Sequence, residues 1–185
     1  MEKEILRNTE QKMKKGVEHL RQELASVRTG KATTALLDPV RVEYYGSQVP
    51  LNQIAGVSAP EARLLVVHPW ERAMVPEVEK AILKADLGLN PTSDGTIIRI
   101  PIPSLTEERR KDLVKVVRKM VEEGRVTIRN LRREGNDEIK SAEKKGSISE
   151  DVSRKTQNEI QNLTDKHIEM MDELLTKKEA EIMEV

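Results

Sequence analysis

The sequence predicts an α+β protein in which an elongated three-helix bundle carries a small inserted domain of strands and one helix. Three segments repeat apolar positions at spacings of four, three and four residues, an eleven-residue period typical of long, nearly straight packed helices. Between residues 32 and 104 the composition changes, because all eight prolines and all three aromatic residues lie there but only 14 of the 64 charged residues. We therefore expect residues 1–30 and 105–185 to form the bundle and residues 31–104 the inserted domain.

The first helix is expected from Glu2 to Thr29, with Gly30 as its left-handed cap. Its basic residues line up beside the apolar face and include Arg21 and Arg28. The expected core face consists of Thr9, Met13, Gly16, Leu20, Leu24 and Val27.

The inserted domain is expected to be a small mixed sheet packed on one helix. Alternation from Val40 to Tyr45 predicts a half-buried strand, and Gly46-Ser47 fits a two-residue hairpin turn. The remaining expected elements are strands at Ile54–Ser58 and Leu64–Val67 with Pro60-Glu61 in the turn between them, a helix begun near Pro76 with core face Val78, Ala81, Ile82 and Ala85 and closed by Gly88, and strands at Leu89 and Ile97–Ile102.

The central helix is expected from Leu105 to Lys145, a stretch without proline. Ser104 or Thr106 can cap its start, and Pro103 prevents an earlier one. Gly124 and Gly135 each cost about 1 kcal/mol against alanine in a helix interior, and close approach of a neighbouring helix explains them better than local flexing. The expected core face is Leu113, Val117, Met120, Gly124, Ile128, Leu131, Gly135, Ile139 and Ala142.

Basic residues concentrate along a second face of this central helix. From Arg109 to Arg133 there are ten basic residues against three acidic ones. Arginine has a forked set of donors that suits phosphate, so this stripe suggests a nucleic-acid backbone as the partner. On this helix alone a solvated charged face explains the pattern equally well. The stripe includes Arg125, Arg129, Arg132 and Arg133, together with Lys111, Lys115, Arg118 and Lys140.

A third helix is expected to begin at Ser149, which can cap it. Its apolar face keeps the same period through Thr156, Ile160, Leu163, His167, Met171, Leu174, Lys178, Ile182 and Val185. Because the first and second helices flank the inserted domain, two connections join the two parts. We expect a mobile hinge there, at Gly30, Lys31, Pro101, Pro103 and Ser104.

Composition excludes several classes of function. The chain has no cysteine, equal numbers of acidic and basic residues and no apolar run long enough to span a membrane, so a cytoplasmic protein is expected. His19, His68 and His167 are far apart in the sequence and in different elements, so they are not expected to form a set of metal ligands. His167 is expected in the core. Asn90–Gly95 resembles the start of a calcium loop, but Pro101 stands where a bidentate glutamate is needed, so we interpret it as a turn. We expect no catalytic residue, metal or cofactor.

Four motifs resemble the bacterial ribosome recycling factor family. They are RTGKATTALLDPVRVEYYGSQVPLNQIA from Arg28, DLGLNP from Asp86, DGTIIRIPIPSLTEERRKDLVK from Asp94 and RVTIRNLRRE from Arg125. The resemblance covers the whole chain. It implies an L-shaped arrangement of a three-helix bundle and a β/α/β domain joined by a flexible hinge.

The resemblance implies a translation factor that is not an enzyme. Such factors bind the post-termination 70S ribosome with the bundle against ribosomal RNA of the large subunit. With elongation factor G, which hydrolyses the GTP, they separate the subunits so that mRNA and tRNA leave. We also expect a monomer without a membrane partner.

The RNA-contacting arginines implied by the resemblance are Arg132 above all, then Arg129 and Arg28. Arg132 lies at the border of the core face and the basic stripe, where packing can hold it while it reaches a phosphate or base edge. We extend the candidate site to Arg133, Arg125 and Arg21. Gly135 departs from the family pattern, which has a better helix former there, so we expect a softer central helix and a gain in stability on Gly135→Ala.

The alternative function is that of a structural bundle that docks partner helices. It explains the periodicity but not the basic stripes or the inserted domain. RNA binding weakens steeply as salt rises, whereas apolar helix packing does not, so a salt series separates the two. An enzyme is the third class, but no arrangement of catalytic residue types in the sequence supports it.

Overall fold

A computed structural model describes residues 1–184 of the chain. The protein forms two compact units, one of residues 1–28 with residue 106 onward and one of residues 29–105. The first contains only long helices and the second a small sheet domain, so the predicted α+β class with an inserted domain is confirmed. Within residues 1–184, no helix is long and apolar enough to cross a membrane.

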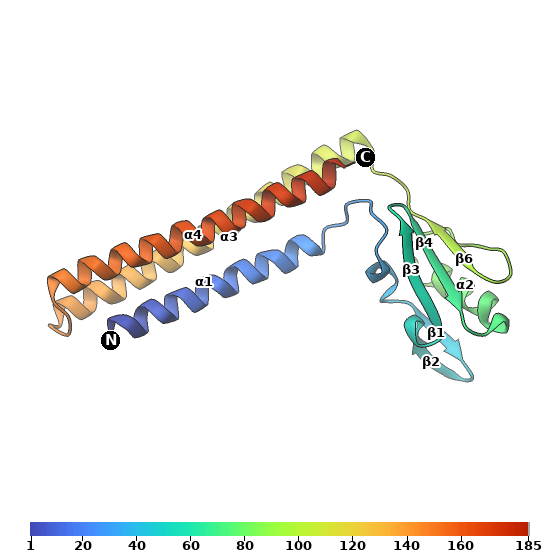
Figure 1. Ribbon diagram of the computed structural model, residues 1–185, viewed down its shortest axis with the longest axis horizontal. Coiled ribbons are helices and arrows are strands. Elements are labelled where there is room, and N and C mark those ends of the chain that lie inside the picture. Colours follow the sequence, from blue (N-terminus) through green and yellow to red (C-terminus); the bar gives the residue numbers. More distant parts are fainter. Residues whose placement is uncertain (185) are drawn as a thin grey trace. The chain divides into compact units, whose positions relative to one another are not determined.

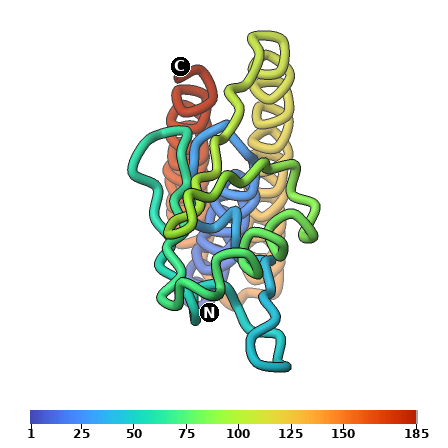
Figure 2. Tube along the Cα trace, turned by 90° about the vertical axis from the view of Figure 1, so that its right-hand side faces the viewer, coloured from blue at the N-terminus to red at the C-terminus, as the bar shows by residue number. Residues whose placement is uncertain are grey.

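The bundle consists of three helices that lie side by side in both views (Figures 1 and 2). They are α1 (Glu2–Ala25), α3 (Glu107–Lys144) and α4 (Glu150–Met183). The helix α3 runs antiparallel to α1, because Gly16 faces Ile128 whereas Gly135 faces Thr9. The long apolar stripes of all three helices meet along one axis, which buries them from end to end.

The predicted core faces are confirmed, since every residue on them from Thr9 to Ile182 is buried or half-buried. Val185 lies outside the described residues. The prediction was too narrow, however: Val17, Val121 and Thr164 are also buried. Each helix touches two others, so its buried stripe is wider than the single line that a strict period traces.

Side-chain caps fix where two of the helices begin. The Thr106 hydroxyl accepts a hydrogen bond from the backbone N–H of Arg109 at 3.1 Å, and Ser149 accepts one from Val152 at 3.2 Å. Of the two candidates for α3, Thr106 is therefore the cap.

The predicted end of the first helix is wrong. It ends at Ala25, where Ser26 donates its hydroxyl to the carbonyl of Glu23 at 2.6 Å and so satisfies a carbonyl that the helix leaves unpaired. Gly30 does adopt a left-handed conformation, with φ of 78°, but as part of the connection to the next unit rather than as a helix cap.

The inserted domain has two antiparallel sheets and one helix. A hairpin pairs β1 (Arg41–Tyr44) with β2 (Ser47–Pro50). The second sheet has the order β3-β4-β6-β5, and helix α2 spans Val75–Lys84. Its strands are β3 (Ala55–Glu61), β4 (Leu64–Pro69), β5 (Thr92–Ser93) and β6 (Ile98–Pro101).

The expectation of a mixed sheet is wrong, because all described ladders are antiparallel. The crossover through α2 leads to β5 at the sheet edge, and the β5–β6 hairpin then brings β6 back beside β4 in the opposite direction. Leu89, expected in a strand, precedes β5.

Two turns lie elsewhere than predicted. The hairpin turn is Tyr45-Gly46, both with positive φ, and Ser47 already belongs to β2. Pro60 and Glu61 belong to β3, which tolerates a proline because it is an edge strand; residues 62 and 63 turn the chain into β4. The predicted core face of α2 is confirmed, with Val78 and Ile82 buried and Ala81 and Ala85 packed against the same core.

Candidate nucleic-acid interface

Helix α3 presents its arginines in a row along the seam with α4. Burial of Ile128 and Ile139 on its opposite side fixes which residues face outward. Arg118, Arg125 and Arg132 follow one another at seven-residue intervals, and each reaches a side chain of α4. This helix pair therefore places the predicted basic stripe at one edge of the bundle.

The contacts of these three arginines differ in strength. Arg118 Nε lies 2.6 Å from Glu179 Oε1, and Arg125 Nε lies 2.8 Å from Asp172 Oδ1. Arg132 Nη1 makes only a long contact, 3.4 Å from Gln161 Oε1. Arg132 is therefore oriented by a neutral amide, without a carboxylate that would neutralise it.

Glu122 ties Arg125 and Arg129 together. Its carboxylate lies 2.9 Å from Arg125 Nη1 and 3.2 Å from Arg129 Nη1. Hydrogen bonds from Arg125 and then Arg129 lower the pKa of Glu122, because they favour its charged form. Glu122 thus brings together two guanidinium groups whose residues lie about two turns (Arg125) and one turn (Arg129) before Arg132.

Carboxylate contacts, rather than exposure alone, separate the arginines that can reach a ligand from Arg125, which braces the fold. The side chain of Arg125 is 22% exposed and that of Arg129 is 41% exposed. Both edges of the Arg125 fork already contact carboxylates, and hydrogen bonding to Asp172 raises its pKa. Arg133 is exposed and Arg132 half-buried. The group best placed for an external anion is thus Arg129, Arg132 and Arg133.

The structure does not join the α1 arginines to this group. Arg21 is exposed and lies 3.6 Å from Glu18 on its own helix, and Arg28 is exposed just beyond the end of α1. No contact described in residues 1–184 links either of them to an arginine of α3. The six predicted arginines therefore form two groups.

Two backbone hydrogen bonds fix the chain on the sheet side of both connections. The N–H of Ala32 donates to Ala62 at 2.7 Å, and the N–H of Ile102 donates to Arg63 at 2.8 Å. Both connections are thus held by the turn between β3 and β4. Pro101 lies inside β6, paired with Leu64, so it is a sheet residue.

The other predicted hinge residues lie outside these anchors. Gly30 and Lys31 precede Ala32, and Pro103 and Ser104 follow Ile102 without regular structure. Leu105 packs directly over Gly30, where an added methyl group would lie 3.0 Å from Leu105 Cγ.

Sequence reasoning missed the α4 residues that order the arginines. Gln161 contacts Arg132 and donates its amide N–H to Asp165 at 2.8 Å, while Asp172 and Glu179 pair with Arg125 and Arg118. A signal was present, because the acids at 165, 172 and 179 repeat at the same seven-residue interval as the arginines.

Neither the histidines nor the acidic residues form a metal site in residues 1–184, where no group of three ligands comes together. His167 is 1% exposed, as predicted for a core residue, and its Nδ1 donates to the carbonyl of Leu163 at 2.7 Å.

The Asp94 carboxylate accepts hydrogen bonds from the N–H groups of Ile97 and Thr96, which lower its pKa to about 2. The interpretation of residues 90–95 as a turn is therefore only partly right, because Thr92–Ser93 form strand β5 and the turn lies between β5 and β6, at residues 94–97.

Comparison with protein families gives one match over most of the chain. The family described as ribosome recycling factor matches residues 20–183. The ribosome-recycling factor of Syntrophomonas wolfei is 54% identical over 185 residues, covering 100% of both chains. That of Moorella thermoacetica is 59% identical over 182 residues, or 98% of both chains.

Solved structures give the same result. A solution structure of ribosome recycling factor has a TM-score of 0.74 and 44% identity, covering 100% of this chain and 98% of the other. A second match is described as models for the T. thermophilus ribosome recycling factor and the E. coli elongation factor G bound to the E. coli post-termination complex. Its recycling factor has a TM-score of 0.62 and 50% identity, covering 100% of both chains.

Proposed function

Because this chain belongs to the ribosome recycling factor family, we propose that it is a translation factor of the post-termination ribosome. Together with elongation factor G and GTP, it splits the ribosome into subunits and so releases mRNA and tRNA for a new round of protein synthesis. The observation that carries this function is similarity from end to end, at 54% identity over 100% of both chains.

The partners follow from the same relationship. The related factor bound with elongation factor G on a post-termination complex supports the ribosome and elongation factor G as partners of this chain. We propose that the chain acts as a monomer in the cytoplasm, where ribosomes work, and has no catalytic activity of its own, since GTP hydrolysis belongs to elongation factor G.

We propose that Arg132, Arg129 and Arg133 bind phosphates of ribosomal RNA. Three closely spaced guanidinium groups on a rigid helix suit a nucleic-acid backbone, because arginine can donate two parallel hydrogen bonds to one phosphate. Arg132 has no carboxylate partner in the described structure, and its neutral contact with Gln161 leaves its charge available. Arg125 does not bind the phosphates in this proposal, but its ion pair with Asp172 holds α3 against α4 beside the three arginines.

Arg21 on α1 and Arg28 just beyond its end form a second proposed contact surface. Both are exposed, and they carry the basic stripe of that helix. The proposed hinge consists of Gly30 and Lys31 on one connection and Pro103 and Ser104 on the other, since the hydrogen bonds of Ala32 and Ile102 fix the chain on the far side of both.

Light scattering of purified bacterial ribosomes tests the function directly. Scattering should fall when this protein, elongation factor G and GTP are all present, and should stay level when any one is left out. A constant signal with all three present, although the protein sediments with ribosomes, would contradict the splitting activity.

Arg132→Ala tests the proposed RNA contact in the same assay. We expect weaker ribosome binding and a salt dependence whose logarithmic slope is smaller by about one. Arg154→Ala is the matched control, because Arg154 is an exposed arginine of α4 that pairs only with Glu150 on its own helix. Equal affinities for the two variants would remove Arg132 from the site.

A further inference from the structure

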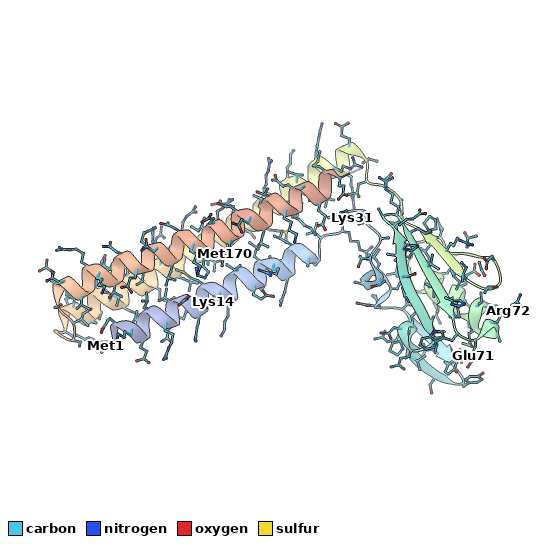
Figure 3. All side chains as sticks on the ribbon, in the orientation of Figure 1. Met1, Lys14, Lys31, Glu71, Arg72 and Met170 are labelled. Atoms are coloured by element: carbon cyan, nitrogen blue, oxygen red, sulfur yellow. The ribbon has the colours of Figure 1, made fainter. Side chains whose placement is uncertain are left out.

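All three aromatic residues of the chain are in the inserted domain, and two of them share one carboxylate. Tyr44 donates its hydroxyl to Glu71 Oε1 at 2.6 Å, and Tyr45 donates to Oε2 at 3.0 Å. The two rings meet edge to face with centroids 4.5 Å apart. Trp70 directly precedes Glu71, which Figure 3 labels on this domain. We call Tyr44, Tyr45, Trp70 and Glu71 the aromatic corner.

Of the aromatic corner, only Tyr44 packs against the core of the domain. Tyr45 is 81% exposed and Trp70 65% exposed, whereas the core of this domain is built from aliphatic residues and Met74. Large aromatic rings usually contribute their surface to a protein interior or to an interface. A chain with so few aromatic residues that leaves two of them mostly in solvent gains little hydrophobic burial from those two.

Tyr45 also occupies a conformation that disfavours it. It has a φ of 46° and is followed by Gly46 with a φ of 84°, the pair of left-handed residues found in a tight hairpin turn. Asn-Gly is the preferred sequence for such a turn, and a bulky residue with positive φ is strained. The strain is a second, independent sign that the tyrosine ring is needed outside the fold.

The corner is rigid before any partner arrives. Glu71 holds both phenol groups, and its hydrogen bond to Tyr44 raises the pKa of that hydroxyl to about 12. Rings fixed in this way lose little conformational entropy on binding. The Glu71 carboxylate keeps further lone pairs, since two oxygens can accept about four hydrogen bonds.

We propose that the aromatic corner binds a protein surface of the post-termination ribosome that presents an arginine or lysine side chain. The cation would lie against the exposed ring faces of Tyr45 and Trp70, as cations do on aromatic rings, and donate to the free lone pairs of Glu71. Tyrosine and tryptophan are also the residues most enriched at the energetic centres of protein interfaces. This inference rests on the proposed function for its setting, but it concerns a different unit of the chain from the arginines of α3.

The net charge of the inserted domain makes RNA an unfavourable ligand for the aromatic corner. Residues 32–104 contain six Lys or Arg and eight Asp or Glu, in contrast to the basic stripe of α3. An RNA-stacking surface combines aromatic rings with a positive groove for the backbone, whereas here a carboxylate accepts the hydroxyl groups of both tyrosines. The same carboxylate attracts a cationic side chain.

A photo-crosslinker next to the corner tests the proposal without altering it. Ser47→p-benzoyl-phenylalanine places the reactive group on β2, opposite Tyr44 in the ladder. The full-length protein is bound to post-termination ribosomes with elongation factor G, illuminated, and its adducts are identified by mass spectrometry. The same crosslinker at Leu83, which is 57% exposed on α2, is the matched control.

Tyr45→Asn and Trp70→Ala are then added to the Ser47 crosslinker protein. Asn-Gly suits the turn, so the asparagine variant keeps its fold, which a thermal melt verifies. We expect an adduct to a ribosomal-protein peptide containing arginine or lysine, reduced about tenfold by either variant, as for a central interface residue, whereas an adduct to elongation factor G alone would overturn the ribosomal partner.

The contrary outcomes are distinct. Adducts to RNA, a yield that neither variant changes, or no adduct from protein that sediments with ribosomes would overturn the role of the corner alone. Failure to sediment at all would overturn the proposed function and this inference with it.

Discussion

At the scale of single residues, the two glycines in the middle of α3 permit close helix packing. A methyl group on Gly135 would lie 2.8 Å from Thr9 Oγ1 and 3.3 Å from Ile160 Cδ1, and one on Gly124 would lie 3.2 Å from Met171 Sδ. Gly135 is therefore the point where α1 and α4 approach α3 most tightly among the described glycines. This geometry argues against the expected gain in stability from alanine at Gly135, whereas the expected softness of the helix stays a prediction.

We predict that Gly135→Ala destabilises the bundle. Alanine gains about 1 kcal/mol of helix propensity over glycine, but the clash with the buried Thr9 side chain exceeds that gain, since overpacking costs about 1–3 kcal/mol. Gly16→Ala is the control, because its methyl group would meet only Ile128 Cδ1 at an ordinary 3.5 Å and should stabilise. Urea unfolding followed by circular dichroism measures both, and a stabilised Gly135→Ala would refute the clash.

The double variant Gly135→Ala with Thr9→Ala identifies the contact responsible. Removing the Thr9 side chain gives the new methyl group room, so the double variant should be more stable than the sum of the two single effects predicts. Strict additivity would place the cause elsewhere.

The two tyrosines provide a second test at the residue scale. Glu71 raises the pKa of Tyr44 from 10.0 to about 12 and raises that of Tyr45 as well, because each hydroxyl donates to the carboxylate while protonated. The stabilising effect is therefore fully present below pH 10 and is lost as pH rises toward 12. Glu71→Gln should return both titrations, followed by tyrosinate absorbance, toward 10.0, whereas Glu77→Gln should leave them unchanged.

Residue-level prediction succeeded where one helix decides the outcome. The position of Arg132 at the border of the core face follows from helical geometry alone, and so does the burial of His167. The clash at Gly135 and the brace of Asp172 on Arg125 could not be predicted, because they depend on which residue of another helix lies opposite. Helical period fixes a face but not the register between helices.

At the scale of elements, the start of α3 depends on one hydroxyl. Thr106 caps the helix through Arg109, and both Glu107 and Glu108 lie in the first turn, where the helix dipole favours negative charge. The sequence left Ser104 and Thr106 as equal candidates, because both stand shortly before the first apolar-periodic residue.

We predict that Thr106→Ala lowers the stability of the bundle by about 1 kcal/mol, the usual effect of losing a cap. Ser104→Ala should leave it unchanged within error. Denaturant unfolding followed by the helical signal measures both, and a loss confined to Ser104→Ala would mean that α3 begins earlier in solution.

Strands were harder to predict than helices. Strand existence followed from alternation and from proline and glycine positions, but the turns at Tyr45-Gly46 and at residues 62 and 63 lie one or two residues from the expected ones. Proline at position 60 suggested a turn, whereas an edge strand accommodates it. Pairing order depends on contacts between distant segments, which a local pattern does not contain.

At the scale of the whole molecule, two compact units are joined by two short connections. The hinge prediction belongs to this scale. Residual dipolar couplings of the free protein should require a separate alignment tensor for residues 29–105 and for the bundle, since the residues outside Ala32 and Ile102 lack regular structure. A single tensor for the entire chain would mean that the two units move as one body.

The anchoring of both connections on Ala62 and Arg63 has a consequence for how the chain folds. Helices α1 and α3 must meet although residues 29–105 separate them, and each doubling of a flexible loop adds about 0.6 kcal/mol to the entropy of closure. Once the insertion has folded, its two ends leave from adjacent residues, so α1 and α3 meet as if joined by a short hairpin. Substitutions that destabilise the small sheet should therefore slow the assembly of the helix bundle, although they lie outside it.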